Sequence, residues 1–382
     1  MGVILRLKRD YGPKFLFNWE VVVKIFKIVL TGGPCAGKTT AVEQIKKELK
    51  EKNIPCIVWN EVATELINSG IKPWEWEPFE FQSFVLKKCM LNEEISSHYK
   101  VKNEDKEGIV VILFDRAIYD NMAYLNSSSE FFKLLRFHGL DPMKTLDSYD
   151  LVIDMLSLAT CKPIDYNIIN NLARTETPEE ACEKDLKTSQ AWANHRNLKI
   201  MSSVVSETEE IEMIKKTIYD FIDGKYEDKV TRFLVDSENS DLSAYNNYIA
   251  IDTDSFYLDT CDDSKCKVSE NRCNGVSYTL EIYKDVDDRR IKTTSTIISE
   301  EYYNDLLYTY NSLGEEIAKE IGFVYERNLC KLIFDGNNVI LEIHSNNVND
   351  DIKIPNNIKV IREINSNEMN FGTKFKKKVL NK

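Results

Sequence analysis

The residues best suited to chemistry stand in one short segment near the start of the chain. The pattern GxxxxGK[ST] is matched by Gly32, Gly33, Pro34, Cys35, Ala36, Gly37, Lys38, Thr39 and Thr40. Glycines let successive backbone N–H groups curl around a chain of phosphates, and the lysine amine reaches the β- and γ-phosphates. The hydroxyl that follows the lysine is a ligand for Mg²⁺. The segment therefore predicts a site for a nucleoside triphosphate with Mg²⁺ as cofactor.

The flanking sequence places this segment between a strand and a helix. Residues 24–31 are an apolar, β-branched run typical of a strand that is buried on both faces of a parallel sheet. Residues 41–52 have a helical pattern rich in Glu, Lys and Leu. Because strand, glycine loop and helix occur in the order that the motif requires, we interpret the segment as a phosphate-binding loop rather than an ordinary glycine turn.

Two other strand ends carry candidate site residues. The apolar run 108–114 ends in Asp115 and Arg116. An acid at such an end holds a water on Mg²⁺ or takes a proton from a substrate hydroxyl, so Asp115 is predicted to be catalytic and, with Thr39, a metal ligand. Arg116 is predicted to contact a phosphate or an acidic substrate group, and Glu61, at another strand-to-helix turn, is a second substrate-binding candidate. Capping of the next helix is the alternative for both acids.

A lid is expected later in the same region. Strands at 151–155 and 198–201 are separated by a segment in which Thr177-Pro178-Glu179-Glu180 is a helix-start signature. Arg174, just before it, could close on a transferring phosphoryl group and act as a catalytic residue; a solvated arginine is the alternative. Strands that alternate with helices over residues 25–222 predict an α/β domain with a doubly wound parallel sheet.

Four separated segments carry a resemblance to a known family: residues 30–40, 115–120, 170–181 and 191–195. Together they resemble the P-loop domain of the nicotinamide-riboside-kinase part of NadR, and they are most similar to the TRPL translocation defect family. The resemblance implies binding of a nucleoside triphosphate, GTP in that family, followed by hydrolysis or phosphoryl transfer. No NKxD segment, through which regulatory GTPases recognise guanine, is present, which excludes a Ras-type switch and leaves GTP and ATP as alternatives.

The rest of the chain predicts an antiparallel domain. Alternating patterns indicate strands at 232–235, 248–251, 276–283 and 291–298, a hairpin over 329–343 and a helix over 299–310. The pattern suggests a β-barrel-like fold that resembles the CYTH-like, triphosphate-tunnel domain, which the TRPL translocation defect family also carries. The opening ExExK signature of that fold is altered here at Val230, which argues against triphosphatase chemistry.

Basic residues in this second domain could line a tunnel: Lys284, Arg290, Lys292, Arg327 and Lys331. The resemblance implies a phosphorylated ligand there, such as a phosphoinositide or phosphatidic acid, with contact to a membrane surface. Solvated strand faces explain the same charges. The predicted boundaries are an extension at 1–26, a P-loop domain at 27–224, a CYTH-like domain at 228–371 and a basic tail at 372–382, which either attracts anionic lipid or is a disordered, solubilising end.

Composition excludes some functions. A net charge of −12 disfavours broad nucleic-acid binding, since the phosphate backbone would be repelled. No apolar run reaches the ~18 to 20 residues of a membrane-spanning helix. Nine scattered cysteines favour a reducing, cytoplasmic setting. Cys261, Cys266 and Cys273 lack a CxxC pair, so ordinary cysteines in a mobile loop are expected there rather than a zinc site.

Three functions fit the sequence. The first is a GTP- or ATP-binding protein with slow hydrolysis, whose second domain senses a phospholipid and so acts in membrane trafficking. The second is a metabolite kinase, with Asp115 as base and Arg116 and Glu61 holding a nucleoside-like acceptor. The third is a scaffold that binds nucleotide for stability alone.

Overall fold

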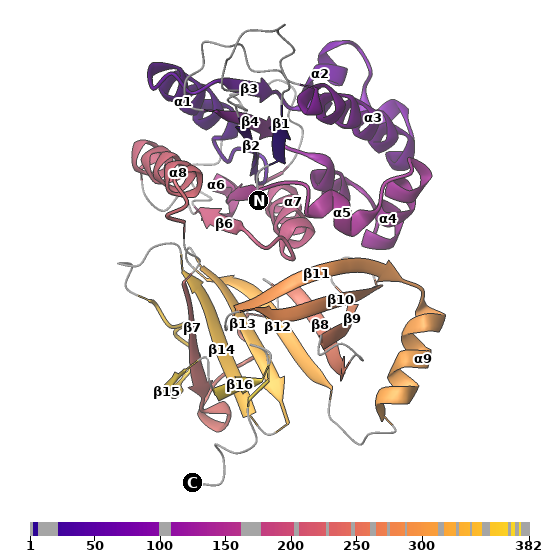
Figure 1. Cartoon of the computed structure of the whole chain (residues 1–382), viewed down its shortest axis with the longest axis vertical. Coiled ribbons are helices and arrows are strands. Elements are labelled where there is room, and N and C mark those ends of the chain that lie inside the picture. Colours follow the sequence, from indigo (N-terminus) through magenta and orange to yellow (C-terminus); the bar gives the residue numbers. More distant parts are fainter. Residues whose placement is uncertain are drawn as a thin grey trace, which may run out of the picture. The chain divides into compact units, whose positions relative to one another are not determined.

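The structure is a computed structural model, shown in Figure 1. It describes residues 3–6, 22–98, 108–161, 177–201, 206–226, 229–245, 249–259, 265–272, 276–286, 289–311, 317–325, 328–336, 338–345, 352–365, 368–370 and 374–375. The chain divides into two compact units. The first comprises Met1–Tyr124, Leu146–Thr188 and Asn194–Tyr226, and the second Leu125–Thr145, Ser189–Ala193 and Glu227–Lys382.

The first unit contains a parallel sheet. Its strands are β2 (Val22–Thr31), β3 (Cys56–Trp59), β4 (Ile109–Asp115), β5 (Leu151–Met155) and β6 (Leu198–Met201), in the spatial order β3-β4-β2-β5-β6. A short strand, β1 (Val3–Arg6), pairs antiparallel with β2 inside the predicted extension. Because β2 lies between β4 and β5, the direction of chain progression reverses there, and ligands bind at the carboxyl ends of strands at such a point.

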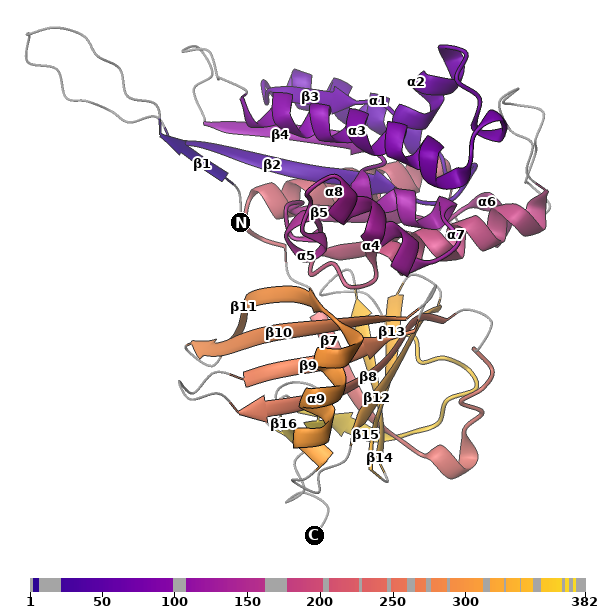
Figure 2. The same cartoon turned by 90° about the vertical axis from the view of Figure 1, so that its right-hand side faces the viewer.

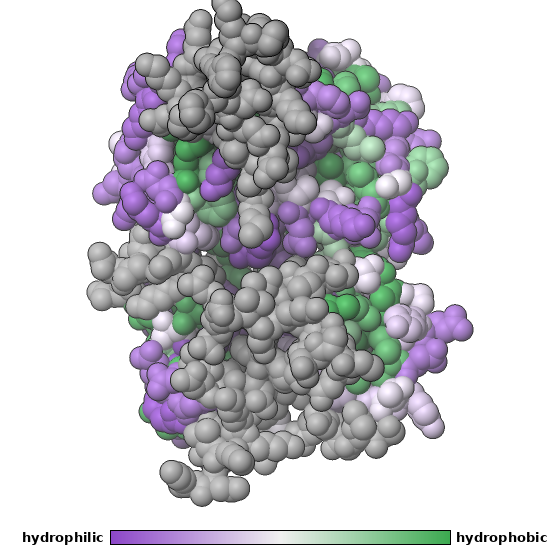
Figure 3. Space-filling model, viewed as in Figure 1, coloured by the Kyte–Doolittle hydropathy of each residue, from purple (hydrophilic) through white to green (hydrophobic). Residues whose placement is uncertain are grey.

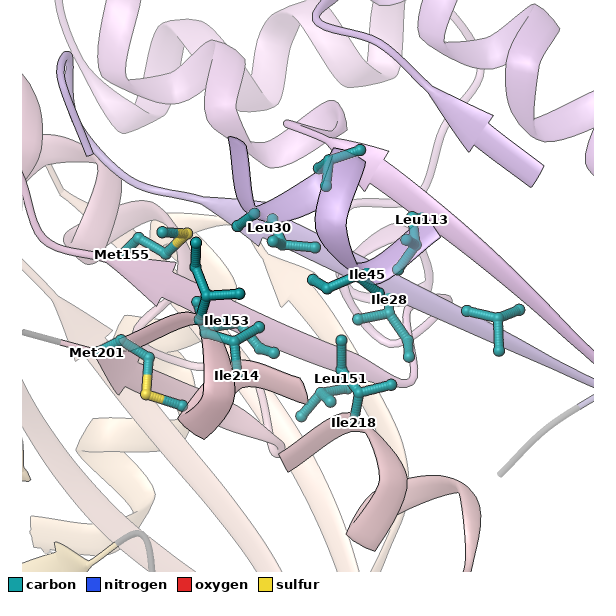
Figure 4. Close-up of a cluster of buried hydrophobic side chains, with 14 of the residues drawn as sticks. Ile28, Leu30, Ile45, Leu113, Leu151, Ile153, Met155, Met201, Ile214 and Ile218 are labelled. Carbon is teal, nitrogen blue, oxygen red and sulfur yellow. The ribbon is translucent and has the colours of Figure 1, made fainter. Parts of the chain in front are cut away.

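Helices cover both faces of this sheet. On one face α1 (Lys38–Glu51) and α8 (Glu207–Ile222) pack against the apolar side chains of the central strands, as Figure 4 shows for Ile28, Ile45, Leu151 and Ile218. On the other face Lys27 of β2 forms an ion pair with Glu93 of α3 (Pro78–Ser97). In Figure 1 α1 and α8 lie to the left of the sheet, and α3 and α2 (Val62–Asn68) lie to its right. The predicted doubly wound α/β fold is confirmed.

The helices between Pro73 and Trp192 that have not yet been described are short, with one exception. They are η1 (Pro73–Glu75), η2 (Ile118–Tyr124), α4 (Ser128–Phe137), α5 (Pro142–Leu146), α6 (Leu158–Cys161) and the longer α7 (Pro178–Trp192). Helix α7 begins as its sequence predicts, because Thr177 Oγ1 accepts from Glu180 N–H at 3.2 Å and Glu180 Oε2 accepts from Thr177 N–H at 2.8 Å.

The second unit contains a nine-stranded antiparallel sheet with the order β11-β10-β9-β8-β12-β13-β14-β7-β15. The strands are β7 (Lys229–Val235), β8 (Ile249–Asp259), β9 (Lys265–Asn271), β10 (Ser277–Val286), β11 (Arg289–Ile298), β12 (Ala318–Tyr325), β13 (Asn328–Asp335), β14 (Asn338–Ser345) and β15 (Val360–Ile364). Among the described strands the path is open, with β11 and β15 at its edges. Figure 2 shows β9 to β11 running across the direction of β12 to β14, so the sheet is strongly coiled. The predicted hairpin, β13 and β14, is confirmed.

Residues that are paired across neighbouring strands lie on the same face of a sheet. The strand register therefore sorts the side chains of this sheet into two faces, which differ in chemistry. One face carries two apolar clusters, and α9 (Glu300–Asn311) contributes the buried Tyr303 and Tyr310 to one of them. The opposite face carries a small apolar cluster that includes Ile333 and Ile340, and beside it a polar part whose buried members include Thr253, Ser255, Ser269, Glu320 and Glu342. A buried polar face of this kind requires internal hydrogen bonds and ion pairs.

One sequence expectation for this unit is wrong. Cys266 lies in strand β9 and is buried in an apolar cluster, not in a mobile loop. In this strand Cys266 and Val268 face the apolar cluster, and the charged Lys267 between them faces the opposite side. This short alternation was overlooked because the three cysteines were considered as one cluster. Cys261 and Cys273 lie outside the described residues.

The surface in the view of Figure 3 mixes hydrophilic and hydrophobic side chains over the described parts. Large hydrophobic side chains with the greatest exposure include Trp74, Phe137 and Tyr308. Within the described ranges, no helix combines the length and apolar character needed to cross a membrane.

Candidate nucleotide site

The phosphate loop connects β2 to α1 and depends on glycine at defined places. Gly32 has a φ of 130°, and a Cβ there would collide with the carbonyl oxygen of Met155. Gly37, directly before α1, has a φ of 76°, which is a left-handed conformation that glycine adopts without strain. The loop therefore approaches the end of β5 closely and turns sharply into the amino terminus of α1, where backbone N–H groups attract anions.

Lys38 is the central cation of the site. Its side chain is buried, and Nζ donates to the carbonyl oxygens of Gly32 at 3.0 Å and Gly33 at 2.8 Å. Burial, with a smaller contribution from the charge of Arg116, lowers the pKa of Lys38 to about 8, although nearby carboxylates act in the opposite direction. The geometry thus holds an ammonium group against the loop in surroundings that disfavour its charge, and a bound anion would stabilise that charge.

Asp115 and Thr39 face each other beside the loop. The Thr39 hydroxyl donates to Asp115 Oδ2 at 3.3 Å, whereas Asp115 Oδ1 is buried and has no hydrogen-bond partner among the described residues. Burial raises the pKa of Asp115 above its ordinary range. A buried carboxylate oxygen that lacks a donor, next to a hydroxyl, is the kind of hard oxygen pair that Mg²⁺ uses together with phosphates and water, so these residues fit the ion.

A charged wall lies next to Asp115. Arg116 donates from Nε to Glu61 Oε1 at 2.7 Å and from Nη1 to Asp120 Oδ1 at 3.2 Å. Burial opposes its charge, but Tyr124 and the neighbouring carboxylates hold the pKa of Arg116 well above its usual range. Burial likewise opposes ionisation of Glu61, but the charges of Arg116 and Lys38 leave its pKa below normal. The structure therefore brings both predicted substrate-binding residues together in one ion-pair network.

Glu61 and Asp120 have different roles in this wall. Glu61 occupies the position before α2 without a capping hydrogen bond from its side chain to the backbone. Asp120 accepts from the Ala117 N–H at 2.8 Å and from the Thr31 hydroxyl, which fixes its carboxylate. Asp120 was not among the predicted site residues, although it ends the 115–120 segment that carries the family resemblance.

Asp185 of α7 is a second residue that sequence reasoning missed. It is 1% exposed, and its carboxylate accepts from the N–H of Gly33 at 2.7 Å, from the N–H of Ser157 at 3.0 Å and from the hydroxyl of Thr160 at 2.7 Å. It stands 152 residues after the glycine that it contacts, and no motif marks it.

Several predicted residues cannot be placed in a site. Arg174 and Arg327 lie outside the described residues. Lys284, Arg290 and Lys292 belong to β10 and β11, which pair with each other. Lys331 lies on β13, directly opposite Glu342 of β14, on the polar face of the second sheet.

That polar face contains a buried charge cluster. Glu342 accepts from Arg232 Nε at 2.7 Å and bonds His344 Nε2 at 2.8 Å, while Lys267 donates to Glu320 at 2.8 Å. Burial opposes ionisation of Glu342, but the bond to His344 and the charges of His344, Lys331 and Arg232 lower its pKa to about 2. Two cations on this face, Arg232 and Lys267, are thus held in ion pairs with acids, a feature that the basic residues alone did not predict.

A parallel sheet with a switch point, a glycine loop and a buried lysine at the amino terminus of a helix together define a P-loop nucleotide-binding domain. Residues 27–207 match the family model described as an AAA domain, which supports this class. No curated protein matches the chain. Among the described residues no group of three or more His, Cys, Asp or Glu side chains forms a metal site by itself, so a cation would share its ligands with phosphate and water.

Proposed function

We propose that the protein binds GTP or ATP with Mg²⁺ and hydrolyses it slowly. The observation that carries this proposal is Lys38, a buried amine that donates to two loop carbonyls and has a lowered pKa. A buried amine in this state has a strong electrostatic reason to exchange carbonyl partners for phosphate oxygens.

The residues of the site take distinct roles in this proposal. Lys38 and the loop amides bind the β- and γ-phosphates, and Thr39 and Asp115 would hold Mg²⁺, which neutralises charge on the phosphates when bound. Arg174, assigned from sequence, would stabilise the charge on the phosphoryl group that is transferred. Asp115, beside the ion-pair network of Arg116, is placed to orient a water or a hydroxyl.

Calorimetry with ATP and GTP, each with and without Mg²⁺, tests the binding step. We expect saturable binding that weakens when Mg²⁺ is removed, together with release of inorganic phosphate in the absence of any acceptor. Flat titrations of folded protein with both nucleotides would contradict the proposal.

A metabolite kinase is the second candidate, because one specific feature favours it. The Glu61, Arg116 and Asp120 network forms a polar wall next to Asp115, and slow hydrolysis alone does not require such a wall. In this reading Arg116 and Glu61 hold a nucleoside-like acceptor such as nicotinamide riboside, and Asp115 accepts its hydroxyl proton. Formation of ADP or GDP that depends on the acceptor would favour the kinase over the hydrolase.

For the second unit we propose binding of a phosphorylated ligand, such as a phosphoinositide or phosphatidic acid, at a membrane surface during protein trafficking. The resemblance to CYTH-like, triphosphate-tunnel domains supports this, as does the polar face on which Lys331, Arg232 and Lys267 lie. Closure of the coiled sheet into a barrel would turn this face inward. The ligand would have to replace carboxylates as the partner of these cations.

A further inference from the structure

The phosphate loop has a fixed support outside its own motif. Asp185, on α7, uses both carboxylate oxygens: Oδ1 accepts from Gly33 and Ser157, and Oδ2 accepts from Ser157 and Thr160. All three donors belong either to the loop or to the segment from Ser157 to Thr160 that follows β5. The Asp185 side chain therefore links its own helix, α7, to two other segments: the phosphate loop and residues 157–160.

The contact with the loop is tight on the side of Gly33. A Cβ built on Gly33 would lie 2.5 Å from Asp185 Oδ1 and 2.8 Å from its Cβ, so glycine is required for the approach. The neighbouring Pro34 is held from the same direction, since the Ser157 hydroxyl donates to its carbonyl oxygen. The first part of the loop is thus fixed from α7 and from the end of β5.

A glycine loop needs such a support for a physical reason. Its residues have few side chains with which to hold their own conformation, and glycine loses more conformational freedom on ordering than any other residue. A loop already ordered before the ligand arrives avoids that loss on binding. A buried carboxylate near a phosphate site is unfavourable in charge, because it has the same sign as the ligand. The hydrogen bonds that Asp185 accepts therefore explain its presence better than its charge does.

Helix α7 also contacts an aromatic ring beside the charged wall. Lys184, the residue before Asp185, places its Nζ 5.5 Å from the centre of the Tyr124 ring, and the guanidinium of Arg116 lies 5.8 Å from the same ring. Two consecutive residues of α7 therefore contact the phosphate loop and the Tyr124 ring that Arg116 also approaches.

We propose that Asp185 is a positioning residue that holds the phosphate loop in its triphosphate-binding conformation through hydrogen bonds from Gly33, Ser157 and Thr160. The proposal rests on nucleotide binding by this site and adds to it the residue that orders the loop. Asp185 does not touch the nucleotide in this account; it acts through the backbone of Gly33.

The experiment compares four full-length variants with the wild type. Asp185→Ala removes the acceptor, and Asp185→Asn keeps it, because the amide oxygen accepts from Gly33 and Ser157 while the amide N–H donates to the rotatable Thr160 hydroxyl. Thr160→Val removes a single donor. Glu183→Gln, an acid-to-amide change at an exposed position of the same helix, is the matched control. The measurements are the dissociation constants for ATP and GTP with Mg²⁺, kcat and KM, and hydrogen exchange of the Gly33 amide.

We expect Asp185→Ala to weaken nucleotide binding at least about tenfold and to speed exchange at Gly33, as loss of a charged hydrogen bond predicts. Asp185→Asn should remain within about threefold of the wild type, and Glu183→Gln should be unchanged. Normal affinity and normal exchange in Asp185→Ala would overturn the proposal. So would an Asp185→Asn variant as weak as Asp185→Ala, since the charge rather than the hydrogen bonds would then matter.

Two further outcomes are separable. If Asp185→Ala does not fold, Thr160→Val decides, because faster exchange at Gly33 supports the proposal and unchanged exchange contradicts it. If the wild type binds no triphosphate, the proposed function fails, while the exchange rates still report whether Asp185 holds the loop.

Discussion

At the scale of single residues, the charge of Lys38 depends on what the site contains. Without an anion its ammonium group has two carbonyl oxygens as partners, and burial lowers its pKa. Asp115 is the acidic counterpart, since its buried Oδ1 accepts no hydrogen bond from the described residues. A triphosphate and a divalent cation would relieve both, which is why these two residues carry the functional argument.

The first prediction concerns Lys38→Ala. Removing the amine deletes a charged contact to the β- and γ-phosphates, so we expect nucleotide affinity to fall at least about 100-fold. Calorimetry and nucleotide-dependent thermal stabilisation measure this. Lys47→Ala, at an exposed position on the same helix, should bind normally. Normal binding by Lys38→Ala would show that the loop is not the nucleotide site.

The second prediction concerns pH and Glu342. The pKa of Glu342 is lowered to about 2 in the folded state, so its stabilising effect is fully present above its ordinary pKa of about 4.5 and is lost as pH falls toward 2. We expect Glu342→Gln to reduce the free energy of unfolding by about 2–3 kcal/mol at neutral pH, and the difference from the wild type to shrink between about pH 4.5 and 2. Urea unfolding at several pH values measures it.

Glu238→Gln, at an exposed position in the same unit, serves as the control and should show little difference at any pH. A difference for Glu342→Gln that stays constant with pH would mean that Glu342 is not held in its charged form by its neighbours.

At the scale of elements, α7 connects the parts of the nucleotide site. Its start is coded locally by Thr177 and Glu180, and its middle supplies Asp185 to the phosphate loop. The segment directly before it contains Arg174.

The third prediction is that Arg174→Ala slows turnover far more than it weakens binding. If Arg174 stabilises the charge of the transferred phosphoryl group, kcat should fall by about 10³-fold with little change in nucleotide affinity. Single-turnover measurements give the rate, and Arg196→Ala, at an exposed position in the first unit, is the control. Equal losses of rate and affinity would reduce Arg174 to a binding residue.

Local sequence patterns predicted most of the strands, but they could not predict contacts between residues that are distant in the sequence. The strand, loop and helix around Lys38 are contiguous in the sequence, so their spacing alone predicts the candidate nucleotide site. Asp185 could not be predicted because it reaches the loop only through the packing of α7. Strands β9 and β12 were not predicted. Only two of the seven residues of β9 are apolar, Cys266 and Val268, and β12 contains Gly322, which weakens a strand pattern but lets Ile251 of β8 approach closely.

At the scale of the whole molecule, each unit has a candidate site built on a different principle. The first concentrates backbone amides and one lysine at a helix start. The second distributes cations over strands, and two of them, Arg232 and Lys267, form ion pairs with acids.

The fourth prediction separates the two sites. Simultaneous substitution of Arg290→Glu and Lys292→Glu should reduce binding to phosphatidylcholine vesicles that contain phosphoinositide or phosphatidic acid, because charge reversal repels an anionic headgroup. Nucleotide affinity of the same variant should be unchanged. Vesicle co-sedimentation and calorimetry measure the two effects.

Simultaneous substitution of Lys319→Glu and Lys359→Glu, both at exposed positions in the second unit, makes the same change in net charge and serves as the control. Equal loss of vesicle binding in this control would assign the effect to overall charge. Normal vesicle binding by the double variant would direct attention to the basic tail.

The backbone of Arg116 has a consequence for how this protein could change over time. Arg116 has a φ of 64°, a conformation that costs a side-chain-bearing residue about 1–2 kcal/mol and glycine almost nothing. A glycine at this position would ease the backbone but would remove the guanidinium that joins Glu61 to Asp120. Selection for stability of the backbone alone would therefore favour glycine at this position. Retention of the arginine during evolution would indicate that its ion pairs matter more to the protein than the backbone strain.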